Sequence, residues 1–474
     1  MGVACLAKYL FTIPDDALIF VYCSWRDRNF ILTNKNTNSL WRRLIKRNAF
    51  LLAAMIVVFV CKSVKAEDLI GSLATQSSLT DTKDGPKAQL RTFGVQPDVW
   101  ITQICQGIMS GTPPKNTYCG GKIDAFLRVD AEKLGLWKGF HVFTQFEQYT
   151  GNTVNNITGT LLPVSAIQAF VQPKYYHNTL TLFIKQELNE HLSVSAGKVN
   201  IMTLAAKTPI LGGGGWETFM NRAFAIPKTG IGITAPGTLA DRVIVAPTYT
   251  LGAMVDLKTK VGNFTFSVAD PRNAEDPRVL QNPFARGVAF GGGYTLPLKL
   301  AGLQGYHNVR VAYSDARGFD LDDFSGLRAR ILHGQTITKK GYWFAGYALQ
   351  QYLVQSEDDP SVGWGLFTNV SISDGNPNPV KWSLLAGVAG NNLIEGREHD
   401  KWGVGYYHYG LSQLLIDGLE AGHIYRRSEG GVECFYNFAI TPWVQLSADL
   451  QVIDPWKVEK TRETIGAIRL FTKL

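Results

Sequence analysis

The chain has 474 residues and a formal net charge of +8, so it is too long for one small domain. Ten of its 47 basic residues but only three of its 39 acidic residues fall within residues 1–66, so the remainder is close to neutral. The excess positive charge therefore lies in residues 1–66. No nucleic-acid-binding motif accompanies it, which argues against a nucleic-acid partner.

Residues 1–66 have the organisation of an export signal. The basic stretch WRRLIKRN precedes a run of 12 apolar residues, Ala49–Val60, and the next segment ends in small residues at Val64 and Ala66. A membrane-spanning helix needs roughly 20 apolar residues, so the run indicates a Sec signal peptide rather than an anchor. We expect residues 1–66, an upstream extension plus this signal, to be removed. A periplasmic lead-in (67–87) and a barrel domain (88–474) remain.

Apolar and polar residues alternate along the mature chain. Such stretches are KIDAFLRVD (122–130), GNFTFSVAD (262–270), NVRVAYS (308–314), LRARI (327–331) and VKWSLLAGV (380–388). A period of two predicts strands, and a half-exposed soluble sheet would show it too. Strands of about 9–12 residues with mid-strand charges and terminal Tyr and Trp residues favour a membrane barrel.

Eighteen alternating segments are candidate strands: 92–105, 121–130, 138–149, 164–173, 178–188, 191–201, 243–257, 261–270, 286–297, 304–314, 325–335, 340–353, 361–373, 380–389, 401–412, 432–440, 444–453 and 464–474. If both ends of the mature chain lie in the periplasm, the strand number is even. We therefore predict an all-β fold, a transmembrane antiparallel β-barrel of 16 strands, with 18 as the alternative. Short turns are expected in the periplasm and longer loops outside.

The last-but-one hairpin, ECFYNFAITPWVQLSADLQVI (433–453), has a predictable register. Pairing Ile440 with Val444 aligns Phe438 with Leu446 and leaves a three-residue loop, 441–443. A two-residue loop would pair apolar with polar side chains, so the parity of the pleat argues against it.

A glycine-rich stretch, GGGGWE (212–217), lies in a segment of about 25 residues (203–228) between candidate strands. It lacks the Lys-Ser/Thr pair of a phosphate-binding loop. This segment either folds into the lumen as a constriction or lies outside as an external loop.

Three cysteines remain after residue 66. Cys105 and Cys119 are separated by 13 residues, and in an oxidising periplasm a disulfide between them would stabilise the fold by ~3 kcal/mol. Cys434 falls on the lipid face and is expected to act as a small hydrophobic residue.

Several motifs resemble the carbohydrate-selective porins of Gram-negative outer membranes, the OprB type. They are, in the family's order, VDAEKLGLWKG (129–139), WETFMNRAF (216–224), LPLKLAGLQGYHN (296–308), GWGLFTNVSISDGNPNPVKWSLLAGVAG (363–390), EGREHDKWGVGYYHYGLS (395–412) and ITPWVQLSADLQVI (440–453). The resemblance covers roughly residues 80–474. It implies an outer-membrane porin for passive diffusion of carbohydrates and other small polar solutes, with no cofactor and no metal. Its implied partners are small sugars, outer-membrane lipid and the barrel assembly machinery. For the oligomeric state, a monomer and a homotrimer remain alternatives.

Alternation and the possible inserted loop nominate pore-lining residues: Arg128, Glu147, Glu217, Asn221, Arg222, Arg310, Arg328, Arg330, Lys381, Glu433 and Asp449. A mixed lining suits polyhydroxyl solutes, which both donate and accept hydrogen bonds. A general or weakly ion-selective porin, a plugged structural barrel and a barrel enzyme are the alternatives. His399 beside Asp400 is the most enzyme-like pair, but no nucleophile pattern accompanies it, and we expect no catalytic residues.

Overall fold

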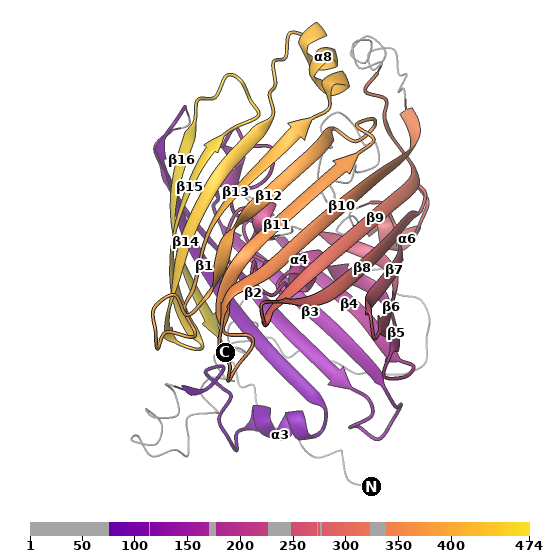
Figure 1. Ribbon diagram of the computed structural model, residues 1–474, viewed down its shortest axis with the longest axis vertical. Helices are drawn as coiled ribbons and strands as arrows, with labels where there is room; N and C mark the ends of the chain where they lie inside the picture. Colours follow the sequence, from indigo (N-terminus) through magenta and orange to yellow (C-terminus); the bar gives the residue numbers. More distant parts are fainter. Residues whose placement is uncertain are drawn as a thin grey trace, which may run out of the picture. The chain divides into compact units, whose positions relative to one another are not determined.

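The computed structural model describes residues 75–112, 114–169, 177–225, 248–272, 274, 277–322 and 338–474. In this part of the chain, sixteen antiparallel strands close into one barrel in which β1 pairs with β16 (Figure 1). The strands are β1 (Val95–Ser110), β2 (Thr117–Asp130), β3 (Phe140–Gly151), β4 (His177–Glu187), β5 (Leu192–Asn200), β6 (Tyr249–Thr259), β7 (Gly262–Ala269), β8 (Ala289–Leu300), β9 (Leu303–Phe319), β10 (Thr338–Gln355), β11 (Gly363–Ser373), β12 (Val380–Asn391), β13 (Lys401–Leu411), β14 (Glu429–Thr441), β15 (Val444–Asp454) and β16 (Glu463–Lys473). The predicted all-β barrel of 16 strands is confirmed.

The described helices are short and lie outside the strand ladder. They are α3 (Pro86–Thr92), the 3-10 helix η1 (Val154–Asn156), α4 (Ile201–Ala205), α5 (Arg222–Ala225), α6 (Pro277–Gln281) and α8 (Gln413–Ala421). Among the described residues, no helix is both long and apolar enough to cross a bilayer.

The two ends of the barrel differ in the length of their connections. The end near α3 and the C-terminus carries short turns such as 260–261, 301–302 and 442–443, whereas α8 and the starts of the long connections after β3 and β5 lie at the opposite end (Figure 1). We refer to these as the turn end and the loop end. In bacterial outer-membrane barrels the turn end faces the periplasm.

Side chains alternate between the outer and inner faces of the wall. On β4, Leu180 and Leu182 are 56% and 52% exposed, whereas Thr179 and Thr181 are 7% and 3% exposed. Apolar groups point outward because a bilayer is the favourable solvent for them, and polar groups are left to the lumen.

The lead-in is fastened to the turn end. Lys87 forms an ion pair with Asp98 at 2.6 Å, and its ammonium donates to the Leu474 carbonyl oxygen at 3.1 Å. The Leu79 amide also donates to the carbonyl oxygen of Lys473 at 2.9 Å. These contacts hold the lead-in, residues 79–87, against the last residues of β16 and the start of β1.

The predicted strand 164–173 is wrong over its described part. Residues 164–169 belong to the connection between β3 and β4, where the Asn155 amide group donates to the Ser165 carbonyl and the Ala166 amide donates to Met220. Val164 and Ala166 are apolar because they are buried inside the barrel, at 0% exposure each, rather than facing lipid. The other surplus segment, 325–335, lies outside the described residues.

The predicted hairpin register holds except at its tip. Phe438 pairs with Leu446 as expected, but Thr441 pairs with Val444, and a register shift falls between Ala439 and Thr441. The turn therefore has two residues, 442–443, and not three. The bulge absorbs one residue, so the parity argument against a two-residue turn did not apply.

Candidate solute channel

The chain segment 201–211 crosses the lumen. At one side the Thr203 hydroxyl donates to the Gln145 side-chain oxygen on β3 at 2.7 Å. At the other side the amides of Ile210 and Leu211 both donate to the Gln350 side-chain oxygen on β10, at 2.9 and 3.0 Å. Of the two alternatives for segment 203–228, the structure shows the inserted loop over its described part, 203–225.

The next part of this loop packs on glycines of β13. Phe219 and Phe224 stack with ring centroids 4.4 Å apart. A Cβ added at Gly405 would lie 2.5 Å from the Phe224 ring, and one added at Gly403 would lie 2.7 Å from the Phe219 ring. These glycines leave the space that lets the loop lie flat against the inner wall. This contact forms part of a hydrophobic core inside the barrel.

Buried polar groups fix the loop backbone. The Glu433 carboxylate accepts from the amides of Met220 and Asn221. The Arg469 guanidinium, which is fully buried, donates to the carbonyl oxygens of Gly215 and Thr218 at 2.5 and 2.8 Å. Arg469 was absent from the predicted lining, although a charge on the polar face of the last strand was a usable signal.

Glu217 connects the loop to two lysines. Its carboxylate forms ion pairs with Lys401 and Lys473 and accepts from the Gln445 side-chain amide at 3.2 Å. Burial would raise the pKa of the Glu217 carboxyl, but the two ammonium charges outweigh that effect and lower the pKa well below its ordinary value. The carboxylate therefore stays charged, and its role is to hold the loop.

A second anchor lies on β2 and β3. Lys122 pairs with Asp124 at 2.9 Å and with Glu147, and all three side chains have no solvent exposure. The Trp216 indole donates to the Asp124 carboxylate at 2.8 Å, which attaches the glycine-rich stretch to this wall. A buried charge is tolerated here because opposite charges and hydrogen bonds satisfy it.

Five of the predicted pore-lining residues therefore require correction. They lie within the barrel, but the inserted loop covers or contains them, so their side chains are not exposed to the water-filled channel. Their exposures are 0% for Glu147, 1% for Asn221, 2% for Arg222, 0% for Glu433 and 6% for Asp449. Alternation predicted which face of a strand is polar, and it could not reveal that a remote loop covers that face.

The described inner wall also carries a row of polar side chains, the polar belt: Asp256 on β6, Thr265 on β7, Arg310 on β9, Ser371 on β11 and Ser383 on β12. Asp256 pairs directly with Thr265, and Ser371 pairs directly with Ser383. Gly293 on β8 lies between Thr265 and Arg310 in the register, and Gly346 on β10 lies between Arg310 and Ser371. The Thr265 hydroxyl donates to the Asp256 carboxylate at 2.8 Å, and the two serine hydroxyls lie 2.6 Å apart. The belt thus offers both donors and acceptors.

Arg310 extends along the wall across a glycine. Its guanidinium donates to the Asn369 side-chain oxygen on β11 at 2.9 Å. A Cβ added at Gly346 would lie 3.3 Å from the Arg310 Nε. The missing side chain at Gly346 gives the guanidinium room on the inner wall. The sequence predicted that Arg310 faces inward, but it did not reveal this arrangement.

A basic group lies near the turn end of the inner wall. Arg128, on β2, is 43% exposed and lies 3.9 Å from Asp98. Partial burial, with the positive charges of Arg128 and Lys185, lowers the pKa of the Lys207 ammonium. Lys207 belongs to the crossing segment, so the structure brings together basic groups from β2, β4 and the loop. Lys207 was missing from the predicted lining because its position depends on the loop.

The remaining predicted lining residues have different positions. Lys381 lies at a register shift between Val380 and Trp382, and its ammonium donates to the Asp374 carbonyl at 3.2 Å. The bulge interrupts the alternation here, so alternation does not assign Lys381 to a face of the wall. Arg328 and Arg330 lie outside the described residues.

The cysteines Cys105 and Cys119 are directly paired on β1 and β2 and are joined by a disulfide. Cys434 carries a free thiol on β14. The disulfide links two neighbouring strands near the loop end and does not contribute a group to the channel wall.

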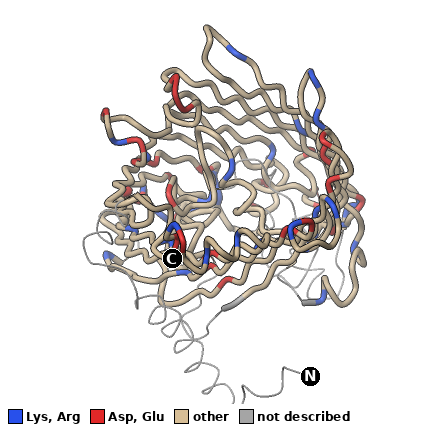
Figure 2. The backbone as a smooth tube through the Cα atoms, turned by 90° about the horizontal axis from the view of Figure 1, so that it is seen from below, with Lys and Arg blue, Asp and Glu red and all other residues tan. Residues whose placement is uncertain are grey.

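Acidic and basic residues are interspersed around the barrel (Figure 2). A closed antiparallel barrel with an apolar outer face, a polar inner wall and an inserted loop defines a porin, integral to the outer membrane.

A family model for carbohydrate-selective porins, the OprB family, matches residues 120–457. The chain belongs to this family, and it is a porin for the passive diffusion of carbohydrates. A search of curated proteins gave no match.

Solved structures agree with the fold. The chain is similar to the high-pH structure of Pseudomonas putida OprB, with 17% identity, a TM-score of 0.72, and coverage of 85% of this chain and 100% of that one. For the low-pH structure of the same protein the identity is 14%, the TM-score 0.50, and the coverage 85% and 99%. Family and fold are those of a channel.

Proposed function

We propose that this porin conducts mono- and small oligosaccharides along the wall formed by β6 to β12, with the polar belt as the contact surface. The observation that carries this proposal is the row of directly paired donors and acceptors from Asp256 to Ser383. A sugar hydroxyl can donate to a carboxylate and accept from a guanidinium, so such a row can exchange water for sugar in successive steps. Weak contacts of this kind permit release, as passive transport requires.

Charges of both signs also follow from this lining. Arg128, Lys185 and Lys207 provide positive charge near the turn end, and Asp256 provides negative charge in the belt. Opposite charges weaken ion selectivity, so other small polar solutes should pass as well.

The test is current block by sugars in planar bilayers, with Arg310→Ala as the variant. Hydrogen bonds to charged groups contribute about 1.5–3 kcal/mol, so loss of the guanidinium should weaken block by roughly tenfold or more and shift ion preference toward cations. Arg317→Ala is the matched control, since Arg317 lies on the same strand and donates to Thr338 rather than to a belt neighbour. Unchanged block and reversal potential in Arg310→Ala would remove the belt from the proposal.

We also propose that the last strand is the signal for the barrel assembly machinery. Ile468 and Leu470 on β16 are 60% and 37% exposed on the outer face, as an apolar recognition strand requires. Replacing both by Asn should reduce the amount of folded barrel in the outer membrane, and the same change at the outer residues Val309 and Val311 on β9 is the control. Equal loss in both variants would contradict a special role for β16.

A further inference from the structure

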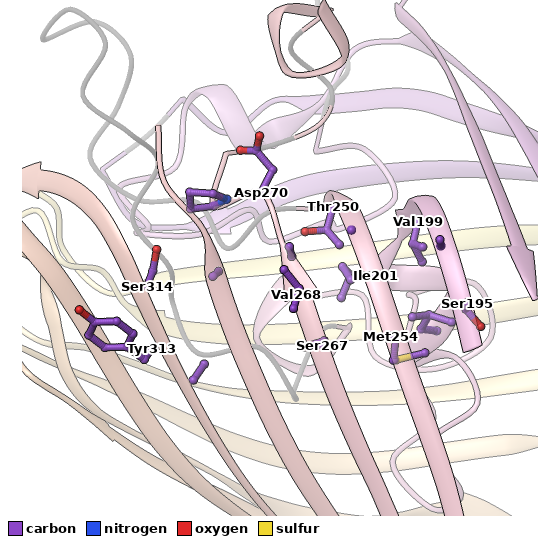
Figure 3. Close-up of a pocket in the computed structure, with 18 of the residues that line it drawn as sticks. Ser195, Val199, Ile201, Thr250, Met254, Ser267, Val268, Asp270, Tyr313 and Ser314 are labelled. Atoms are coloured by element: carbon purple, nitrogen blue, oxygen red, sulfur yellow. The ribbon is translucent and has the colours of Figure 1, made fainter. Parts of the chain in front are cut away.

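A cavity of about 300 Å³ lies on the loop-end side of the polar belt. Its lining includes Met254 on β6, Ala312 on β9 and Phe344 on β10, together with Ile201 and Leu204 of α4. Figure 3 shows Ile201, Met254 and Ser267 among the residues around it. The inserted loop therefore forms one side of this cavity and the barrel wall forms the other.

The position of the cavity relative to the belt follows from the strand register. Met254, Ser267, Gly291, Ala312 and Phe344 are directly paired in a row, two residues along their strands from the row that contains Asp256 and Arg310. Two residues along a strand correspond to roughly 7 Å. A row that is apolar except for Ser267 thus lies next to the polar belt on the same inner wall.

The outer face of the same strands is also apolar, but its side chains are exposed. Val309 and Val311 on β9 are 51% and 55% exposed to the exterior. Ala312, between Val311 and Tyr313, points to the other side. Apolar groups at Met254, Ala312 and Phe344 are therefore an inner feature that contact with lipid does not explain.

We infer that the cavity is a subsite for the aglycone of an aryl glycoside, a solute whose sugar contacts the polar belt while its aromatic ring enters the apolar cavity. An apolar cavity of ~150 Å³ is large enough to bind benzene, so the volume here accommodates one aromatic ring. The short distance between the two rows lets one solute with two directly linked rings reach both. Phe344 and the thioether of Met254 are suitable neighbours for an aromatic ring.

The carboxylate of Asp270, in the cavity lining, is already paired with protein groups. Asp270 at the rim is occupied by Arg272, with an ion pair at 2.6 Å, and by the Phe284 amide. Burial would raise the pKa of the Asp270 carboxyl, but the hydrogen bonds from Arg272 and the amides outweigh this and lower it. The belt, two residues further along the strands, offers the sugar a carboxylate and a guanidinium from Asp256 and Arg310.

This inference rests on the proposed role of the belt, and the experiment separates the two. Current block of the full-length porin in planar bilayers is titrated with methyl β-glucopyranoside, phenyl β-glucopyranoside and phenol. In the wild type the phenyl glycoside should bind about tenfold more tightly than the methyl glycoside, the order expected for burying part of an aromatic ring. Phenol should block more weakly than the phenyl glycoside, because it lacks the sugar.

Ala312→Leu fills the cavity from the wall and should reduce the advantage of the phenyl glycoside to less than about twofold, with block by the methyl glycoside retained. Ala345→Leu is the matched control. It lies on the opposite face, paired with Val311, where an added apolar group meets lipid, and it should keep the wild-type ratio.

The outcomes are distinct. Equal block by the two glycosides in the wild type, an undiminished ratio in Ala312→Leu, or phenol as potent as the phenyl glycoside would each overturn the subsite and leave the belt standing. Absence of block by both glycosides would overturn the belt as well.

Discussion

Phe224 is the residue through which the inserted loop can be tested most directly. It is fully buried inside the barrel, stacks on Phe219 at 4.4 Å, and meets the Tyr407 ring edge-on at 5.9 Å. Gly405 below it has no side chain, so the Phe224 ring fills the space directly above the backbone of β13. The change Phe224→Ala removes this ring without altering a charge or a lipid-facing residue.

The expected magnitude follows from burial. Replacing a fully buried phenylalanine by alanine costs about 3–5 kcal/mol. Because the barrel wall is closed by its own ladder, the loss should fall on docking of the loop and not on the barrel. The population of undocked loop should therefore rise by about two to three and a half orders of magnitude. The polar anchors at Glu433, Arg469 and Glu217 still favour the docked state.

Trypsin cleavage after Arg222 measures this population, since the peptide bond is accessible only when the loop leaves the wall. When reclosing is faster than cleavage, the cleavage rate follows the open population. Mass spectrometry of the folded porin in detergent should show faster cleavage at this bond in Phe224→Ala. Phe224→Leu, which keeps most of the apolar volume, should be intermediate.

The lipid-facing Phe266, 55% exposed, provides the control. Phe266→Ala should leave the cleavage rate at its wild-type value. If Phe224→Ala keeps an intact barrel and is also cleaved at the wild-type rate, the aromatic contact does not hold the loop and the reasoning is refuted.

Three further results are expected. Leu384→Arg should impair assembly by about 2–4 kcal/mol, whereas Ser383→Arg, on the lumen face beside Ser371, should assemble normally and alter conductance; equal assembly defects would contradict the face assignment. Because the folded-state pKa of Glu217 lies below its ordinary value of 4.5, its contribution to docking is present above that value and is lost only as pH falls through the depressed pKa. Conductance noise should therefore be constant from about pH 7 down to about pH 4.5 in the wild type. In Glu217→Gln the noise should be higher over the whole range. Noise that grows over this range in the wild type would contradict the role of the charged Glu217 carboxylate in holding the loop. N-terminal sequencing of the mature porin should begin at Glu67, and a start before Ala49 would disprove removal of the leader.

The fold of this protein could be predicted from local sequence patterns. A period of two predicts strands with one apolar and one polar face, and their length, mid-strand charges and terminal Tyr and Trp residues favour a membrane barrel over a soluble sheet. The same rule placed Leu384 outward, and Arg310 and Ser383 inward. It did not predict the pairing of Val444, which is with Thr441 and not Ile440, because a bulge adds one residue to β14. A bulge at Lys381 likewise interrupts the alternation that the rule counts.

By itself the sequence determined most of the strands and their faces, and the motifs around 363–412 indicated the family. Only the tertiary structure decided which inner faces meet water. Glu433 and Glu147 have the same pattern as residues of an open wall, yet a loop more than 200 residues from Glu433 in the chain supplies amides to it. Val164 and Ala166 resemble a strand but fill the lumen. Burial by a distant segment leaves no periodic trace in either partner, because it depends on where the chain returns and not on the residues beside it.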